Sequence, residues 1–203
     1  MNPSQRGAFI ALEGGDGAGK STQARLIQEH LESEGVPCMV LAFPDRETSE
    51  SGKLIADYLT KKITFGPEAI HLIFAANRRE MEDLIRGSLQ SGMVVIVDRY
   101  LYSGIVYSAA NGLDLGWCKQ ADVGLCEPDH VFYMKVPPQT ALERSERTEI
   151  YETLEFQEKV VGFFDTVLAD AIPIDATQEP SDITQEILSH VTLFPTTDIK
   201  TFT

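Results

Sequence analysis

The sequence predicts an α/β fold in which helices cover both faces of a five-stranded parallel sheet, all within a single domain of residues 1–203. Three observations support this fold. Short apolar segments alternate with amphipathic ones along the chain, as strand–helix–strand units do. Residues 93–97 are all apolar, which is typical of a strand inside a parallel sheet. A glycine-rich loop separates the first apolar segment from the first amphipathic one.

The composition suits one compact domain and argues against two classes of partner. The chain has 203 residues, of which 43% are hydrophobic, so it can bury a sizeable core. Its formal net charge is −14, which repels nucleic acid and anionic membranes. Solubility is the ordinary explanation of this charge. We therefore expect no nucleic-acid or membrane partner, and any phosphate ligand needs a local cluster of basic side chains.

The cysteines and the N-terminal residues predict a cytoplasmic protein, with a nuclear location as an alternative. Cys38, Cys118 and Cys126 are odd in number and form no CxxC motif, which favours reduced thiols. Residues 1–6 lack an apolar stretch, so we expect no secretory signal. A membrane span needs about 18 continuous apolar residues, and no window of the sequence provides them.

The first apolar segment, residues 9–12, leads into a phosphate-binding motif. Gly14 and Gly19-Lys20-Ser21 have the spacing of a P-loop, which makes the predicted fold a three-layer P-loop NTPase. Glycines allow the tight turn, and the N-terminus of the following helix attracts an anion. Lys20 is expected to reach the β- and γ-phosphates, and Ser21 to hold Mg²⁺. The alternative, a turn that binds nothing, is disfavoured by the strand before the motif and the helix after it.

The remaining elements follow from periodicity and from turn residues. Helices are expected at residues 19–33, 49–60, 102–111 and 115–123, with one long helix between Pro67 and Gly92. Further strands are expected at 37–43, 93–97, 131–136 and 171–174. Residues 139–170 are predicted to be helical around a charged lid at about 140–152, and a last helix opens at Pro180. The polar tail, about residues 195–203, is expected to fray.

The loops after the strands should hold the ligand, because α/β sheets bind ligands at the carboxyl ends of their strands. This rule places Asp16, Arg46, Asp98, Arg99 and Asp175 along one edge of the molecule. Arg46 can fork onto phosphate oxygens. Asp98 can reach a metal-bound water or the attacking oxygen, and Arg99 can neutralise phosphoryl charge. The alternative for Asp98 and Arg99, a salt bridge at a strand end, is weaker so close to the P-loop.

Two further groups of residues have competing explanations. Phe74 and Arg78 lie one helical turn apart, so a ring and a guanidinium share one face, as a base with its phosphate would require. Spacing alone favours core packing for Phe74 and a solvated surface position for Arg78. Arg144 and Arg147 lie among glutamates, and this pattern fits a lid and an exposed helix with i,i+4 ion pairs equally well.

Several segments occur in the order of the motifs of the thymidylate kinase family, which the chain resembles from about residue 7 to residue 191. They are residues 13–23, Phe43-Pro44-Asp45-Arg46, residues 72–78, Asp98-Arg99-Tyr100 with residues 101–104, Glu127-Pro128-Asp129, Tyr151-Glu152 and Asp175-Ala176-Thr177. The P-loop is shared by many families, whereas residues 98–104 together with Phe74 and Arg78 are far more specific. The resemblance implies a homodimeric enzyme that makes dTDP from dTMP and ATP with Mg²⁺.

The resemblance also implies roles for the matching residues. Asp16 would bind the 3′-hydroxyl of dTMP, Phe74 would stack on thymine and Arg78 would contact a carbonyl of the base. The whole dTMP site would comprise Asp16, Phe43, Pro44, Arg46, Phe74, Arg78, Arg99, Ser103, Gly104, Tyr107 and Tyr151. The ATP site would comprise Gly15, Asp16, Gly17, Ala18, Gly19, Lys20, Ser21, Thr22, Arg144, Asp175 and Thr177. Ser21 and Asp98 would hold the metal, and Lys20, Asp98, Arg99 and Arg147 would be catalytic.

One position departs from many members of the family. Eukaryotic members often carry an arginine in the P-loop where this chain has Gly17, whereas bacterial-type members have glycine and supply the arginine from the lid. Arg147 or Arg144 is the candidate substitute, and we favour Arg147 for transfer and Arg144 for adenine. An arginine placed in this way is worth roughly 10³–10⁵ in kcat.

Three other functions compete with this interpretation. A different nucleoside monophosphate or deoxynucleoside kinase would differ in the base pocket. A GTP-binding switch needs an Asn-Lys-x-Asp motif and an Asp-x-x-Gly segment, but Leu101 follows Asp98 where that glycine would stand. A P-loop scaffold without chemistry is disfavoured by Lys20, Asp98 and Arg99. If the family assignment holds, a dTMP oxygen that is already ionised attacks the γ-phosphorus of ATP, and no strong base is needed.

Overall fold

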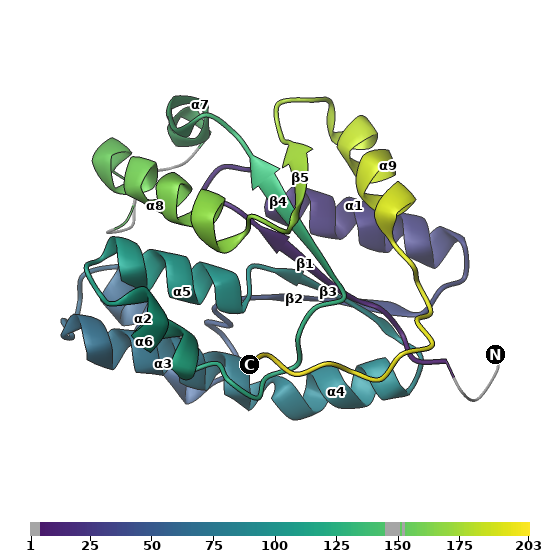
Figure 1. Ribbon diagram of the computed structural model, residues 1–203, viewed down its shortest axis with the longest axis horizontal. Coiled ribbons are helices and arrows are strands. Elements are labelled where there is room, and N and C mark those ends of the chain that lie inside the picture. Colours follow the sequence, from purple (N-terminus) through teal and green to yellow (C-terminus); the bar gives the residue numbers. More distant parts are fainter. Residues whose placement is uncertain (1–4, 145–150, 152) are drawn as a thin grey trace.

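The computed structural model describes residues 5–144, 151 and 153–203, and its centre is a five-stranded sheet (Figure 1). The strand order is β2-β3-β1-β4-β5, and every neighbouring pair is parallel. The strands are β1 (Phe9–Glu13), β2 (Cys38–Ala42), β3 (Val94–Asp98), β4 (His130–Lys135) and β5 (Ile172–Asp175). The predicted strand number, direction and approximate positions are therefore confirmed.

Helices cover both faces of the sheet, as predicted for a three-layer fold (Figure 1). They are α1 (Lys20–Ser33), α2 (Glu50–Leu59), α3 (Pro67–Glu80), α4 (Glu82–Gln90), α5 (Leu101–Ala110), α6 (Leu115–Gln120), α7 (Pro138–Glu143), α8 (Leu154–Val167) and α9 (Pro180–His190). α1 and α9 pack on one face, while α4, α5 and α8 pack on the other. Among the described residues, no helix has the length and apolar composition needed to cross a membrane.

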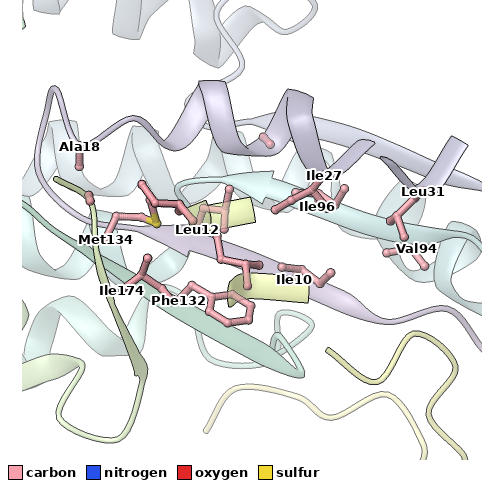
Figure 2. Close-up of a cluster of buried hydrophobic side chains, with 14 of the residues drawn as sticks. Ile10, Leu12, Ala18, Ile27, Leu31, Val94, Ile96, Phe132, Met134 and Ile174 are labelled. Carbon is pink, nitrogen blue, oxygen red and sulfur yellow. The ribbon is translucent and has the colours of Figure 1, made fainter. Parts of the chain in front are cut away.

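The two central strands are buried on both faces, which explains their unbroken apolar sequence. Along β1, Ile10 and Leu12 face α1 and α9, whereas Phe9 and Ala11 face α4 and α5. Figure 2 shows the first of these clusters, in which residues of β1, β3, β4 and β5 meet Ile27 and Leu31 from α1. A strand packed on both sides cannot show the alternation of a half-exposed strand.

The long helix predicted between Pro67 and Gly92 is wrong, because two helices occupy this segment. The break is at Met81, whose φ and ψ are −96° and −4°. After it, α4 packs on β3 and buries Ile85 and Leu89 against the sheet, whereas α3 packs on α2 and α5. One straight helix could not reach both sets of partners. Two leucines of these helices lie at the surface rather than in the core: Leu54 is 43% exposed and Leu84 is 46% exposed.

The C-terminal tail does not fray as predicted. Thr201 forms an antiparallel bridge with Cys126, and the Phe202 backbone N–H donates to Leu125 O at 2.9 Å. Ile199 and Phe202 pack against the cluster that contains α4 and α5. These two apolar side chains anchor a segment whose composition is otherwise polar.

The same end of the molecule holds a largely buried ion pair. The Arg6 guanidinium donates two hydrogen bonds of 2.6 Å to the carboxylate of Asp129, one to each oxygen. Arg6 Nε also donates to Thr197 O at 2.7 Å, and Asp129 accepts the Phe9 backbone N–H at 2.9 Å. The two side chains are 9% and 13% exposed. Arg6 therefore ties together the N-terminal segment, the loop before β4 and the tail.

We predict that Asp129→Ala lowers the free energy of unfolding by about 3 kcal/mol, because it leaves the buried guanidinium of Arg6 without its carboxylate. Urea denaturation at pH 7 measures this change. The matched control is Glu50→Ala, which removes an ion pair between Glu50 and Lys53. The side chain of Glu50 is 87% exposed and that of Lys53 is 62% exposed. The control should change stability by less than about 1 kcal/mol. Equal effects of the two substitutions would contradict the role given to Arg6.

Candidate active site

The loop between β1 and α1 forms the cradle that the motif predicts. Gly14, Gly17 and Gly19 have φ values of 139°, 74° and 81°, which side chains with a Cβ rarely adopt. Gly19 is the N-cap of α1 and makes no side-chain cap, so the first turn presents its backbone N–H groups to the loop. Such a helix end attracts anions.

Lys20 lies inside this cradle with its amine almost enclosed. Its Nζ donates to Gly15 O at 2.6 Å. Burial, followed by the positive charge of Arg99, lowers the pKa of Lys20 to about 8, against the opposing effect of Asp98, Asp16 and Glu13. A bound polyphosphate would supply the negative charge that favours the protonated amine.

A wide pocket opens over the loop and contains most of the residues predicted to bind ATP. Asp16, Gly17, Ala18, Gly19, Lys20, Ser21, Thr22, Arg144 and Thr177 all line it. The two others have supporting positions: the Gly15 carbonyl accepts from Lys20, and Asp175 accepts the N–H and hydroxyl of Thr177 at 2.9 and 2.6 Å. Arg144 Nη1 donates to Ala176 O at 3.2 Å, which puts its guanidinium beside the loop after β5.

Ser21 and Asp98, the predicted metal ligands, are in direct contact. The Ser21 hydroxyl donates to Asp98 Oδ2, and Asp98 Oδ1 is buried without a hydrogen-bond partner in the described structure. An unsatisfied buried carboxylate oxygen is costly and fits a bound cation or its water. Within the described ranges, no cluster of three or more acidic, histidine or cysteine side chains could hold a metal. This donor set therefore suits Mg²⁺, which uses one or two protein ligands together with phosphates and waters.

A second pocket meets the first at this edge of the sheet. Every residue predicted to bind dTMP lines it: Asp16, Phe43, Pro44, Arg46, Phe74, Arg78, Arg99, Ser103, Gly104, Tyr107 and Tyr151. Asp16, Arg46 and Arg99 belong to the walls of both pockets, as do Phe43 and Pro44. A ligand in either pocket would therefore meet the same charged residues.

Asp16 and Arg99 form a charged junction between the two pockets. Arg99 Nη2 contacts Asp16 Oδ1, and Arg99 Nη1 donates to Gly14 O at 2.8 Å. Asp16 Oδ2 also accepts from Tyr107 OH and Gln157 Nε2, both at 3.0 Å. Burial disfavours the charged carboxylate, but the charges of Arg99 and Lys20 outweigh it and hold the pKa of Asp16 below its usual value. Asp16 is therefore an anionic acceptor at neutral pH.

The Arg99 backbone has the positive φ of 65°, which is unusual for a residue other than glycine. Its N–H donates to Leu12 O at 2.9 Å, which continues the β1–β3 ladder by one residue. The strained turn directs the guanidinium back over the glycine loop, and such strain is common at functional sites.

Sequence reasoning assigned no role to Glu13 or Gln157. Glu13 is fully buried, and its Oε1 accepts the N–H groups of Tyr100 and Ser103 at 2.9 and 3.2 Å. It therefore fixes the first turn of α5, next to Arg99. The sequence did contain a signal for Glu13, because it is a charged residue at the end of an apolar strand. Gln157 lies on α8, distant in sequence from Asp16, and only the folded chain brings them together.

The competing explanations given for Phe74 and Arg78 have different outcomes. Phe74 lines the pocket and also packs against the core cluster of Ile55 and Tyr58, so it is both a core and a pocket residue. Arg78 is not on a solvated surface: its side chain is 3% exposed and pairs with Asp122. Sequence reasoning missed Asp122.

The segment predicted to form a lid lies partly outside the described residues. Arg147 lies outside the described residues, as does Glu152. Tyr151 is described, and its hydroxyl lies 3.1 Å from that of Tyr58 while its ring is 5.7 Å from that of Tyr107.

The glycine loop lies directly against α7. A Cβ on Gly17 would lie 2.2 Å from Ala141 O of α7. The glycine loop and α7 are therefore in contact, and no side chain fits between them.

Comparison with known proteins gives one consistent result. A family model described as thymidylate kinase matches residues 12–187. The chain is 42% identical over 192 residues to the thymidylate kinase of Plasmodium falciparum, covering 93% of this chain and 91% of that protein. It is 46% identical over 163 residues to the thymidylate kinase of Arabidopsis thaliana, covering 80% of this chain but only 62% of that longer protein.

A solved structure, that of thymidylate kinase from Candida albicans, has the same fold. It superposes with a TM-score of 0.84 at 30% identity, over 98% of this chain and 99% of that one. The matched family region begins in β1 and ends in α9, so it includes the strands and loops that form both pockets. The chain belongs to the thymidylate kinase family.

Proposed function

We propose that this protein transfers the γ-phosphoryl group of ATP to dTMP, giving dTDP and ADP, as a step of dTTP synthesis. The observation that carries the proposal is the meeting of two pockets at Asp16, Arg46 and Arg99. A phosphoryl transfer between two nucleotides needs a donor site and an acceptor site that share one charged wall.

On the donor side, the triphosphate lies in the glycine loop against the N-terminus of α1, and Lys20 contacts the β- and γ-phosphates. Arg144 and Thr177 line the same pocket near the loop after β5, where we place the adenine. Ser21 and Asp98 would hold Mg²⁺, which neutralises phosphate charge when bound. The unpartnered Oδ1 of Asp98 supports this role.

On the acceptor side, Arg46 and Arg99 hold the dTMP phosphate at the junction of the pockets. The Asp16 carboxylate, kept anionic by Arg99 and Lys20, accepts the 3′-hydroxyl. Tyr107 and Tyr151 close the sugar pocket, with Tyr151 near the 2′ position, and Phe74 stacks on the base. Ser103 and Gly104 complete the wall beside α5.

The chemistry is mainly positioning and charge neutralisation. An oxygen of the dTMP phosphate is ionised at pH 7, so the chain does not need to supply a strong base. Arg99 lies where it can hold the acceptor phosphate against the donor. Residues 140–152 would close as a lid, with Arg147 at the transferred group. We also propose a cytoplasmic or nuclear location, for which reduced cysteines are typical, and a homodimer, as the family resemblance implies.

We predict that dTMP is the best acceptor among the nucleoside monophosphates in a coupled ADP-release assay with ATP and Mg²⁺. dUMP should follow at about 10- to 200-fold lower kcat/KM, because one methyl group is worth only about 1–3 kcal/mol in a pocket. AMP, CMP and GMP serve as controls of size and base chemistry. If any of these three exceeds dTMP, another monophosphate kinase activity replaces the one proposed.

We predict that ATP binds more weakly as the pH rises through about 8, the pKa of Lys20 in the free protein. The bound triphosphate favours the charged amine, so above this pH binding must take up a proton. The Kd should be flat below pH 8 and rise by up to about tenfold per pH unit above it. Calorimetric titration with ATP between pH 7 and 9.5 measures the effect.

Lys20→Ala is the control for this titration. It should bind ATP more weakly and lose turnover while keeping the fold, and its Kd should not show the rise above pH 8. A slope as steep in Lys20→Ala as in the parent protein would assign the proton to another group.

We predict different effects for the two lid arginines. Arg147→Ala should lower kcat by about 10³-fold or more with little change in the KM for dTMP, because its interaction forms mainly in the transition state. Arg144→Ala should chiefly raise the KM for ATP, since its guanidinium lies beside Ala176. Steady-state kinetics with each substrate varied in turn separates the two. Near-normal kcat in Arg147→Ala would leave Arg99 and Lys20 as the cations that act on the transferred group.

A further inference from the structure

The guanidinium of Arg78 is held by a carboxylate from outside the pocket. Arg78 Nε and Nη2 each donate to an oxygen of Asp122 at 2.8 Å, in a bidentate arrangement. The two side chains are 3% and 0% exposed, so this is the most deeply buried ion pair in the described part of the chain. Asp122 follows α6 and does not line either pocket, whereas Arg78 does.

This pairing leaves part of the guanidinium available to the pocket. Arginine has five N–H groups and no acceptor, and Asp122 uses one on Nε and one on Nη2. The two N–H groups of Nη1 and one of Nη2 remain. Gly104, on the facing side of α5, makes room for them: a Cβ at this position would lie 2.6 Å from both Nη1 and Nη2. A guanidinium held in this way can only donate hydrogen bonds. It can therefore bind a carbonyl oxygen of a base, but it cannot pair with an amino group.

We propose that Asp122 is a positioning residue that sets the specificity of the base pocket by orienting Arg78. The proposal rests on the function given above and extends it to a residue outside the pocket. Asp122 fixes the plane of the guanidinium, so the remaining donors lie where a pyrimidine carbonyl can accept them. A base with an amino group at that place meets N–H groups that it cannot pair with.

The cost of burying this pair argues for a role beyond stability. Two buried charges are often replaced by apolar residues without loss of stability, because desolvation offsets their attraction. The surroundings of α6 offer an apolar alternative, since Cys118 and Leu125 belong to the core on either side of Asp122. The pair is therefore explained better by what Arg78 must recognise than by what the fold needs.

The experiment compares dTMP and dCMP as acceptors for Asp122→Asn and Asp122→Glu. Asparagine removes the charge, and glutamate keeps it but moves the carboxylate by one methylene. A displacement of a positioned group by about 1 Å can lower the rate up to 100-fold. Both variants should therefore raise the KM for dTMP at least tenfold. They should also lower the ratio of kcat/KM for dTMP to kcat/KM for dCMP at least tenfold. The KM for ATP should not change. Asp122→Glu retains the ion pair and decides the question if Asp122→Asn does not fold.

Two controls separate positioning from structural support. Asp129→Asn weakens the ion pair with Arg6, outside both pockets, so it should lower stability without changing the acceptor preference. In an Arg78→Met background, Asp122→Asn should have no further effect on the preference, because its action passes through Arg78. Unchanged KM and preference in both Asp122 variants, or equal effects with and without Arg78, would overturn the proposal.

The parent protein separates this inference from the proposed function. If it prefers dTMP but the Asp122 variants keep that preference, only the role of Asp122 fails. If it prefers a monophosphate with an amino group at the corresponding position, the proposed function fails, and the role of Asp122 as an orienter of a carbonyl-binding arginine fails with it.

Discussion

The pairing of β1 with β3 is the constraint on which the rest of the site depends. Their register places Leu12 opposite Asp98, so the glycine loop and the Asp98-Arg99 turn leave the sheet side by side. The Arg99 N–H extends this ladder to Leu12 O and fixes the backbone where φ turns positive. A shift of one residue in this pairing would move Asp98 away from Ser21 and turn the side chains of the shifted strand to the opposite face of the sheet. The apolar faces of β1 and β3 therefore specify the geometry of the candidate site as well as the core.

The acidic chain gathers positively charged side chains at this edge of the sheet. Its net charge of −14 opposes the approach of nucleotides, yet Lys20, Arg46 and Arg99 line the pocket over the glycine loop. Lys20 is buried and the Arg99 side chain is 17% exposed, and charge acts more strongly in such desolvated positions than at the surface. The carboxylates of Asp98, Asp16 and Glu13 favour the charged forms of Lys20 and Arg99 before any ligand arrives. If a phosphate binds, Arg99 can replace part of its contact with Asp16 by a contact with the phosphate. Asp16 thus offsets the repulsion between the cations until an anion binds.

The sequence predicts the elements that depend on local patterns and misses those that depend on distant contacts. The glycine loop, the strands and the Asp98-Arg99 turn follow from spacing and apolar runs. Glu13, Gln157 and Asp122 were missed because their partners are distant in the sequence. Glu13 is 87 residues from Tyr100, Gln157 is 141 residues from Asp16, and Asp122 is 44 residues from Arg78. The split at Met81 and the paired tail share this cause, since both are decided by what the segments pack against. The pocket lining was anticipated because it follows a family resemblance rather than periodicity.

The contact between Gly17 and α7 links the composition of the loop to that of the lid. Ala141 O lies so close that any side chain at position 17 would displace α7 or the loop, and the φ of 74° independently favours glycine. The chain therefore cannot place an arginine at position 17 while α7 keeps this position. In the proposed reaction, a cation beside the transferred group would then come from another segment, and α7 leads directly into the stretch that carries Arg144 and Arg147. The close contact of Gly17 with the α7 backbone is thus a physical reason for the proposal that the compensating arginine lies after α7 rather than at position 17.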